Sequence, residues 1–122
     1  MAVTTETARD MGFVISEAPG ALSRELAVVV SGSGALSAGT VLGKITASGK
    51  YAPYDDDNAD GTETAAGILT HAVDATSADA AATVIVRLAE VTSTLLVWAG
   101  TNDAGDKTAG LADLAAKFVI AR

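Results

Sequence analysis

An acidic segment in the middle of the chain carries the residue types that come closest to a metal site. Asp56, Asn58 and Asp60 place side-chain oxygens at positions 1, 3 and 5 of a calcium-binding loop, and the glycine expected at position 6 follows them. Position 12, where such a loop needs a bidentate glutamate, is Gly67, and neither flank has a helical pattern. Asparagine and glycine also favour ordinary turns, and carboxylates at a loop tip are readily solvated. We therefore expect a turn that holds no metal ion.

The side chains that carry most hydrolytic and metal-dependent chemistry are scarce or isolated. His71 is the only histidine, which excludes a site with two histidine ligands and a relay through a second imidazole. No Gly-x-Ser-x-Gly nucleophile elbow occurs, and no motif brings Glu63 and Glu90 together as a carboxylate pair. Residues 32–37 begin like a dinucleotide-binding loop, but the third glycine is absent and a strand follows. We expect no enzymatic activity and no cofactor.

Charge and composition narrow the classes of partner. The 122-residue chain has a formal net charge of −7 and a pI near 4.4, and its eight Lys and Arg residues are scattered. Because it offers no basic stripe to a phosphate backbone, we expect no nucleic-acid binding. Its apolar runs are far shorter than the roughly 20 residues that span a bilayer, and its first ten residues are too polar for a signal peptide, so we expect no membrane association. The absence of cysteine excludes disulfides and thiol catalysis.

The elements that must position these residues are mostly short strands. Apolar and β-branched runs between glycine, proline and polar turns predict strands over residues 13–15, 26–30, 40–46, 51–54, 66–72, 83–91, 95–98 and 118–120. The uninterrupted run 26–30 favours a strand buried on both faces. Leu111, Leu114 and Phe118 lie three and four residues apart and predict one helix over about residues 108–117. We therefore expect one mainly β domain over residues 13–122 with a short C-terminal helix.

A series of glycine-punctuated phrases runs in a fixed order from Val28 to Val91. They are the glycine turn before Leu36, the unit Ala38-Gly39-Thr40-Val41-Leu42-Gly43, the hairpin signal Gly49-Lys50-Tyr51, the acidic loop, Ala65-Ala66-Gly67-Ile68-Leu69, and Val84 to Val91. In this order the phrases resemble the head decoration proteins of tailed bacteriophages, of the phage lambda protein D type. The resemblance implies a small β-clip-like domain that is not an enzyme and binds the outside of a capsid.

The same resemblance implies a partner and a place of action. The partner would be the major capsid protein, and the protein would sit on the expanded head as a homotrimer at local three-fold sites, stabilising the shell against the pressure of packaged DNA. It would assemble in the cytoplasm of the bacterial host and end on the outer surface of the virion. The chain is rich in small residues, which favours a weak self-interface, so we expect the free protein to be largely monomeric.

Residues 1–12 are rich in threonine and charge and have no sustained apolar period, which predicts an extended N-terminal arm. An ordinary frayed terminus has the same composition. Threonine favours extended backbone, and an extended arm can add itself to an exposed sheet edge of the capsid protein through backbone hydrogen bonds. The expected capsid-binding residues are Val3, Thr4, Thr5, Thr7, Phe13 and Val14.

Two other small β-domains compete with this interpretation. Residues 34–43 also resemble the turn-and-strand unit of lipoyl or biotinyl carrier domains, which need a lysine on an exposed hairpin. Here Lys44 falls inside a predicted strand and Lys50 is flanked by Gly49 and Tyr51, so no such lysine is presented. A glycan-binding domain would expose rows of aromatic side chains, and the chain has five aromatic residues in all.

Overall fold

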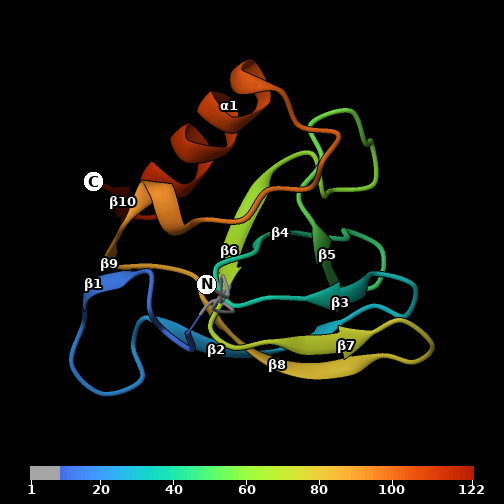
Figure 1. Ribbon diagram of the computed structural model, residues 1–122, viewed down its shortest axis with the longest axis horizontal. Helices are drawn as coiled ribbons and strands as arrows, with labels where there is room; N and C mark the ends of the chain where they lie inside the picture. Colours follow the sequence, from blue (N-terminus) through green and yellow to red (C-terminus); the bar gives the residue numbers. More distant parts are fainter. Residues whose placement is uncertain (1–8) are drawn as a thin grey trace, which may run out of the picture.

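The computed structural model describes residues 9–122 and is mainly β, with one α-helix near the C-terminus, which confirms the predicted fold class (Figure 1). In chain order its elements are β1 (Val14–Glu17), β2 (Arg24–Val29), β3 (Gly34–Leu36), β4 (Val41–Lys44), β5 (Tyr51–Pro53), β6 (Ala65–Leu69), β7 (Val73–Ala75), β8 (Ala80–Ile85), β9 (Ala89–Val91), the short 3-10 helix η1 (Ser93–Leu95), α1 (Ala104–Ala115) and β10 (Val119–Ala121).

Five of the strands close into a barrel in the order β2-β5-β4-β6-β8. β2 and β8 are antiparallel and fully paired, from Arg24 with Ile85 to Val29 with Ala80. On its other side β2 meets β5 at a single residue pair, Val29 with Tyr51. The seam between β2 and β5 is therefore closed by one residue pair, and among the described residues most of β2 has a paired strand on one side only.

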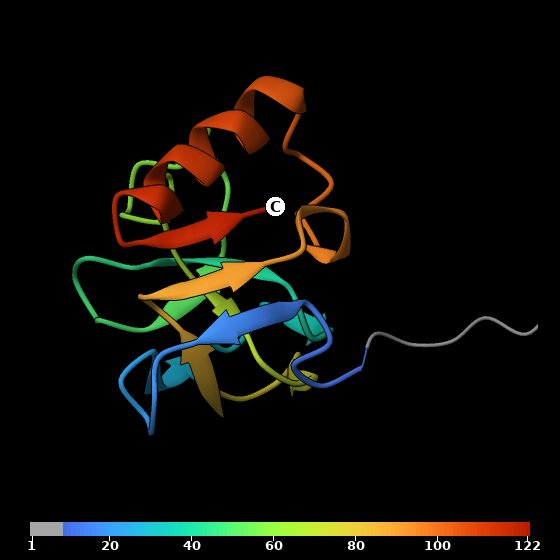
Figure 2. The same ribbon diagram turned by 90° about the vertical axis from the view of Figure 1, so that its left-hand side faces the viewer.

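A second sheet lies beside the barrel. It has the order β1-β9-β10, with β9 antiparallel to β1 and parallel to β10. Figure 2 shows these three strands side by side, with α1 packed above β10. A two-stranded ribbon of β3 and β7 lies at the other end of the barrel (Figure 1).

Buried side chains form two clusters. One cluster fills the space between the barrel, the second sheet and α1, and it includes Phe13, Val41, Tyr54, Ile68, Ile85, Val91, Leu96, Leu114 and Val119. The other fills the far half of the barrel and includes Val29, Leu42, Tyr51, Leu69, Ala75, Ala82, Val84 and Val86. Small side chains contribute much of this interior, as the composition predicts.

Three predicted strands differ from the structure. The segment 83–91 is two strands, because Leu88 adopts a φ of 53° and the chain leaves the barrel there to enter the second sheet. The prediction that residues 26–30 are buried on both faces is wrong, since Leu26 is 90% exposed while Val29 is fully buried. The strand expected over residues 95–98 is absent: η1 ends at Leu95, and Val97 makes only an isolated bridge with Thr40.

The helix begins four residues earlier than predicted because of its N-terminal cap. The Asp103 carboxylate accepts a 2.9 Å hydrogen bond from the Asp106 N–H, and the Asp106 carboxylate accepts a 3.0 Å bond from the Asp103 N–H, a reciprocal capping box. The predicted apolar face is confirmed at Leu114, which is 1% exposed, but it is wrong at Phe118, which follows the helix and is 66% exposed. No helix within residues 9–122 is long and apolar enough to cross a membrane.

Candidate interaction surfaces

The carboxylates of the acidic loop, residues 54–64, bond to the loop's own backbone. Asp55 accepts a 3.0 Å hydrogen bond from the Asp57 N–H, and Glu63 accepts a 2.7 Å bond from the Gly61 N–H. The side chain and backbone of Thr62 donate to Asp60 and lower the pKa of that carboxyl. In the part of the chain that the structure describes, no group of three His, Asp or Glu side chains could hold a metal ion. The geometry is that of a loop closed by Asx-type turns.

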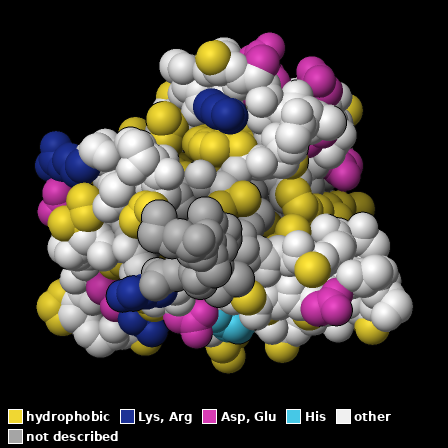
Figure 3. Space-filling view, viewed as in Figure 1, with side chains coloured by type: hydrophobic (Ala, Val, Ile, Leu, Met, Phe, Trp, Pro, Cys, Tyr) yellow, Lys and Arg dark blue, Asp and Glu magenta, His cyan; other side chains and the backbone are white. Residues whose placement is uncertain are grey.

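The same loop is tied to the start of α1. The buried side chain of Asn102 donates a 2.8 Å hydrogen bond to the Tyr54 carbonyl, and Thr101 donates one of 2.8 Å to Asp55. Burial, with the hydrogen bond to Asp56, raises the pKa of Tyr54. The acidic loop and the helix N-terminus thus form one rigid acidic end of the molecule, whose carboxylates gather at the upper right of Figure 3.

His71 is half-buried and lies beside the hydroxyl of its neighbour Thr70. Its Nδ1 lies 3.0 Å from the hydroxyl oxygen of Thr70, and that hydroxyl donates a 2.8 Å hydrogen bond to the Thr83 carbonyl. Because the Thr70 proton is used in that bond, its oxygen accepts from the histidine ring N–H. A catalytic relay would need hydrogen bonds from this ring to a serine and to a carboxylate. The hydrogen bonds of the described residues include neither.

The aromatic side chains serve the core rather than an exposed platform. Phe13, Tyr51 and Tyr54 are at most 5% exposed. Trp98 is half-buried and packs edge-on against Tyr54, with ring centroids 5.8 Å apart. Phe118 alone among the five is well exposed, at 66%. Rows of aromatic side chains, as glycan binding would need, are therefore not present.

The two lysines weighed for a carrier domain have other surroundings. Lys44 is the last residue of β4, and its ammonium lies 5.9 Å from the centroid of the Tyr51 ring. Lys50 forms a 2.7 Å ion pair with Asp79, the residue before β8. Neither lysine stands alone at the tip of a hairpin, so the swinging-arm alternative gains no support.

The structure separates the expected capsid-binding residues into two groups. Val3, Thr4, Thr5 and Thr7 lie outside the described residues. Phe13 is 2% exposed in the core, and Val14 is half-buried in β1 against the same cluster.

Met11, which precedes the predicted domain start at residue 13, also contacts the core. The Met11 N–H donates a 2.8 Å hydrogen bond to the Thr70 carbonyl, and the Met11 side chain packs against the core. Met11 and Phe13 therefore both belong to the packed part of the described chain.

Large apolar side chains are exposed at several places in the described chain. Leu26 and Phe118 are the most exposed large hydrophobic residues of the described chain, at 90% and 66%. Phe118 and Leu88 both adopt left-handed backbone, with φ of 61° and 53°, and the Ala89 N–H donates a 3.0 Å hydrogen bond to the Phe118 carbonyl. Such conformations cost on the order of 1–3 kcal/mol each and persist only where the surrounding structure enforces them.

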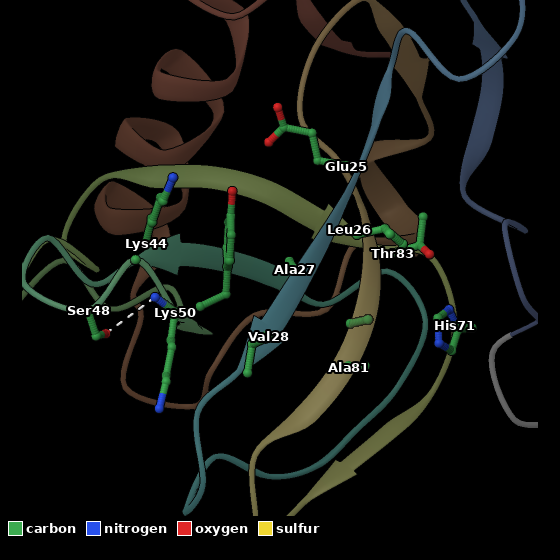
Figure 4. Close-up of a pocket in the computed structure, with 13 residues that line it drawn as sticks. Glu25, Leu26, Ala27, Val28, Lys44, Ser48, Lys50, His71, Ala81 and Thr83 are labelled. Carbon is green, nitrogen blue, oxygen red and sulfur yellow. Dashed lines mark hydrogen bonds between the residues drawn. The ribbon is translucent and has the colours of Figure 1, made fainter.

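The surface on both sides of β2 is hollowed. One hollow of about 710 Å³ is lined by the outer faces of β2 and β8, with Lys44 and Lys50 on one side and His71 on the other (Figure 4). A second hollow, of about 330 Å³, shares Glu25, Lys44 and Tyr51 with the first and extends to Phe118. We call the two together the β2 groove. Through these shared residues the two hollows adjoin each other beside the edge of β2 that faces away from β8.

Comparison with known proteins adds one match. A family model described as Bacteriophage lambda head decoration protein D matches residues 3–119. No curated protein matches the chain. The match includes the barrel, β1, β9 and α1, and it ends at Val119, the first residue of β10.

Proposed function

Since the chain belongs to the family of the bacteriophage lambda head decoration protein D, we propose that it binds the outer surface of the expanded phage head as trimers at local three-fold sites and stabilises the shell against the pressure of packaged DNA. Membership itself gives a capsid decoration role and a place on the virion capsid. The observation that carries the proposal is the match over residues 3–119, which leaves only a few residues at each end unmatched.

The proposed stabilisation is a linkage effect. A protein that binds the assembled lattice and not its separated subunits lowers the free energy of the lattice, by an amount that grows with the logarithm of its concentration over its dissociation constant. The negative net charge supports a role on the outside of the head, since an acidic protein is not attracted to packaged DNA. Assembly would take place in the cytoplasm of the bacterial host.

We propose further that the arm makes a main contact with the capsid protein through Val3, Thr4, Thr5 and Thr7. Fixing an extended arm costs about 1–2 kcal/mol per residue, which backbone hydrogen bonds to a capsid strand would have to offset. The buried root supports this arrangement, because Phe13 and Val14 hold the start of the domain in place. These two residues would then act as the anchor of the arm, and the residues before Met11 would supply the contact.

The test is a truncated protein that begins at Arg9, which keeps Met11 and Phe13 in the core. We expect unchanged far-ultraviolet circular dichroism and a loss of affinity for undecorated expanded heads of at least about a hundredfold, measured by co-sedimentation. A protein that begins at Phe13 is the harsher variant, since it also removes the packing of Met11. If the protein beginning at Arg9 saturates heads with unchanged affinity, the arm is a frayed terminus and the capsid-binding surface lies elsewhere.

A further inference from the structure

The backbone of β2 presents unpaired hydrogen-bonding groups at its free edge. In an antiparallel pair, alternate residues bond to the partner strand and the others point away from it. The Val86 N–H donates to the Ser23 carbonyl, which places the odd-numbered residues of β2 on the β8 side. The Val30 N–H donates to the Tyr51 carbonyl, on the opposite side. Leu26 therefore turns its N–H and carbonyl away from β8, toward the β2 groove, where no strand from residues 9–122 is paired with it.

The surface around this edge carries exposed apolar side chains and more basic than acidic ones, although the chain as a whole is acidic. On the outer face of the β2–β8 pair, Leu26 lies opposite Thr83 and Val28 lies opposite Ala81. The exposed Leu26 side chain therefore has only short side chains beside it. The charged residues that line the two hollows are Lys44, Lys50, Arg87, Lys117 and Glu25. Four cations and one carboxylate thus line the β2 groove of a chain whose net charge is −7.

Two of these cations are uncompensated. Arg87 pairs with Glu25 and Lys50 with Asp79. Lys44 and Lys117 have no ion-pair partner within residues 9–122. An isolated strand edge is a template for an added strand, and natural proteins normally cover it or protect it with charge. Here the positive charge would repel other basic strands and attract an acidic one.

From these observations we infer that the β2 groove binds an extended segment of the shell protein that carries an apolar residue flanked by carboxylates, added as a strand along the free edge of β2. The added strand would hydrogen-bond to the Leu26 backbone, its apolar residue would contact Leu26 or Phe118, and its carboxylates would meet Lys44 and Lys117. This contact rests on the proposed capsid binding, and the residues that line the groove are not those proposed for the arm.

The first test measures hydrogen exchange of the wild-type protein, free and bound to undecorated expanded heads. We expect the amides of Leu26 and Val28 to exchange rapidly in the free protein and to be protected on the heads, because a newly paired edge shields its N–H groups. Heads that bind the protein without protecting these two amides would overturn the inference and leave the proposed function intact. If the protein did not bind heads at all, both the inference and the proposed function would be contradicted.

The second test uses charge variants with a matched control. Replacing Lys44→Glu together with Lys117→Glu should weaken head binding by about tenfold or more, whereas Lys107→Glu, an exposed lysine on α1 away from the groove, should change it by less than about twofold. Leu26→Pro removes the outward N–H and should weaken binding similarly, with folding checked by circular dichroism. Equal affinities for the Lys44/Lys117 variant and the Lys107 control would contradict the inference.

A third measurement identifies the occupant. Light scattering and hydrogen exchange of the free protein are followed over a range of concentrations. If Leu26 and Val28 become protected as free protein self-associates, a second copy of the chain occupies the groove and the shell segment does not. We expect their exchange to be independent of concentration while the protein remains monomeric.

Discussion

The hydroxyl of Tyr54 donates a 2.8 Å hydrogen bond to the backbone carbonyl of Asp106, joining the residue after β5 to the first turn of α1. The Tyr54 side chain is completely buried, and the helix approaches it closely at Gly110, where an added Cβ would lie 3.0 Å from the tyrosine ring. One side chain thus connects the barrel, the acidic loop and the helix. The rigid acidic end of the molecule depends on this connection.

Replacing Tyr54→Phe should therefore lower the free energy of unfolding by about 1 kcal/mol, the usual net value of one hydrogen bond. Tyr54→Ala should cost about 3–5 kcal/mol, because it also leaves a cavity among core side chains. Urea denaturation followed by circular dichroism measures both. Phe118→Leu, at an exposed position, is the control and should change stability by less than about 0.5 kcal/mol. A Tyr54→Phe protein as stable as wild type would mean that water replaces the lost bond.

Gly43→Ala should be among the most damaging small substitutions in the chain. A Cβ at Gly43, in the middle of β4, would lie 2.5 Å from the Cα and 2.7 Å from the carbonyl oxygen of Thr62. These are backbone atoms that cannot move without shifting the acidic loop, so we expect a loss of at least about 1–3 kcal/mol. Gly100→Ala, where a Cβ would meet nothing within 4 Å, is the matched control. Similar urea midpoints for the two variants would contradict the close packing of β4 against the loop.

Acid should destabilise the fold through carboxylates whose pKa values are lowered in the native state. Arg24 lowers the pKa of Glu17 by a hydrogen bond, and Arg122, with Ser16, does the same for Glu90. A carboxyl with a lowered folded-state pKa stabilises the protein above its ordinary pKa of about 4.5, and this contribution is lost as pH falls through the folded value.

We therefore expect the urea midpoint to fall between about pH 5 and pH 3, and to fall less in the Glu17→Gln protein. The effect should be modest because these side chains are partly exposed. Asp57→Asn is the control, since the Asp57 carboxylate accepts no hydrogen bond within the described part of the chain. Identical acid profiles for wild type and Glu17→Gln would show that the Glu17–Arg24 pair does not contribute.

Calcium should not bind the acidic loop with an affinity tighter than about millimolar, because its carboxylates already accept hydrogen bonds from the loop backbone and position 12 of the pattern is Gly67. Calorimetric titration of the wild-type protein is the measurement. A saturable micromolar isotherm that is lost in the Asp56→Ala protein would prove the prediction wrong.

Free protein should be largely monomeric in solution and form trimers on the shell, where neighbouring copies are held at high effective concentration. Multi-angle light scattering from nanomolar to micromolar protein gives the mass directly. A trimer that persists at nanomolar concentration would place the main self-interface within the free protein and make the capsid a secondary contributor.

The sequence alone predicted the mainly β class, the single late helix, the turn at residues 48–50 and the family resemblance, because these depend on local features. Glycine spacing, β-branched runs and the leucine face of the helix are all readable within a few residues. The capping pair Asp103 and Asp106 was also a readable signal for the helix start, although the prediction placed the start later.

Tertiary structure alone decided which strands pair and which surfaces stay open. The sequence near Leu88 does not indicate that the chain turns there. Leu88 has left-handed backbone, its carbonyl accepts a hydrogen bond from the Ser23 hydroxyl, and its N–H donates one to the Lys117 carbonyl. The exposure of Leu26 likewise depends on tertiary structure, because its side chain projects from the outer face of the β2–β8 pair, where no described element packs on it. An uninterrupted apolar run has the same sequence whether one face or both are covered, because burial of a strand is determined by the partners that pack on it.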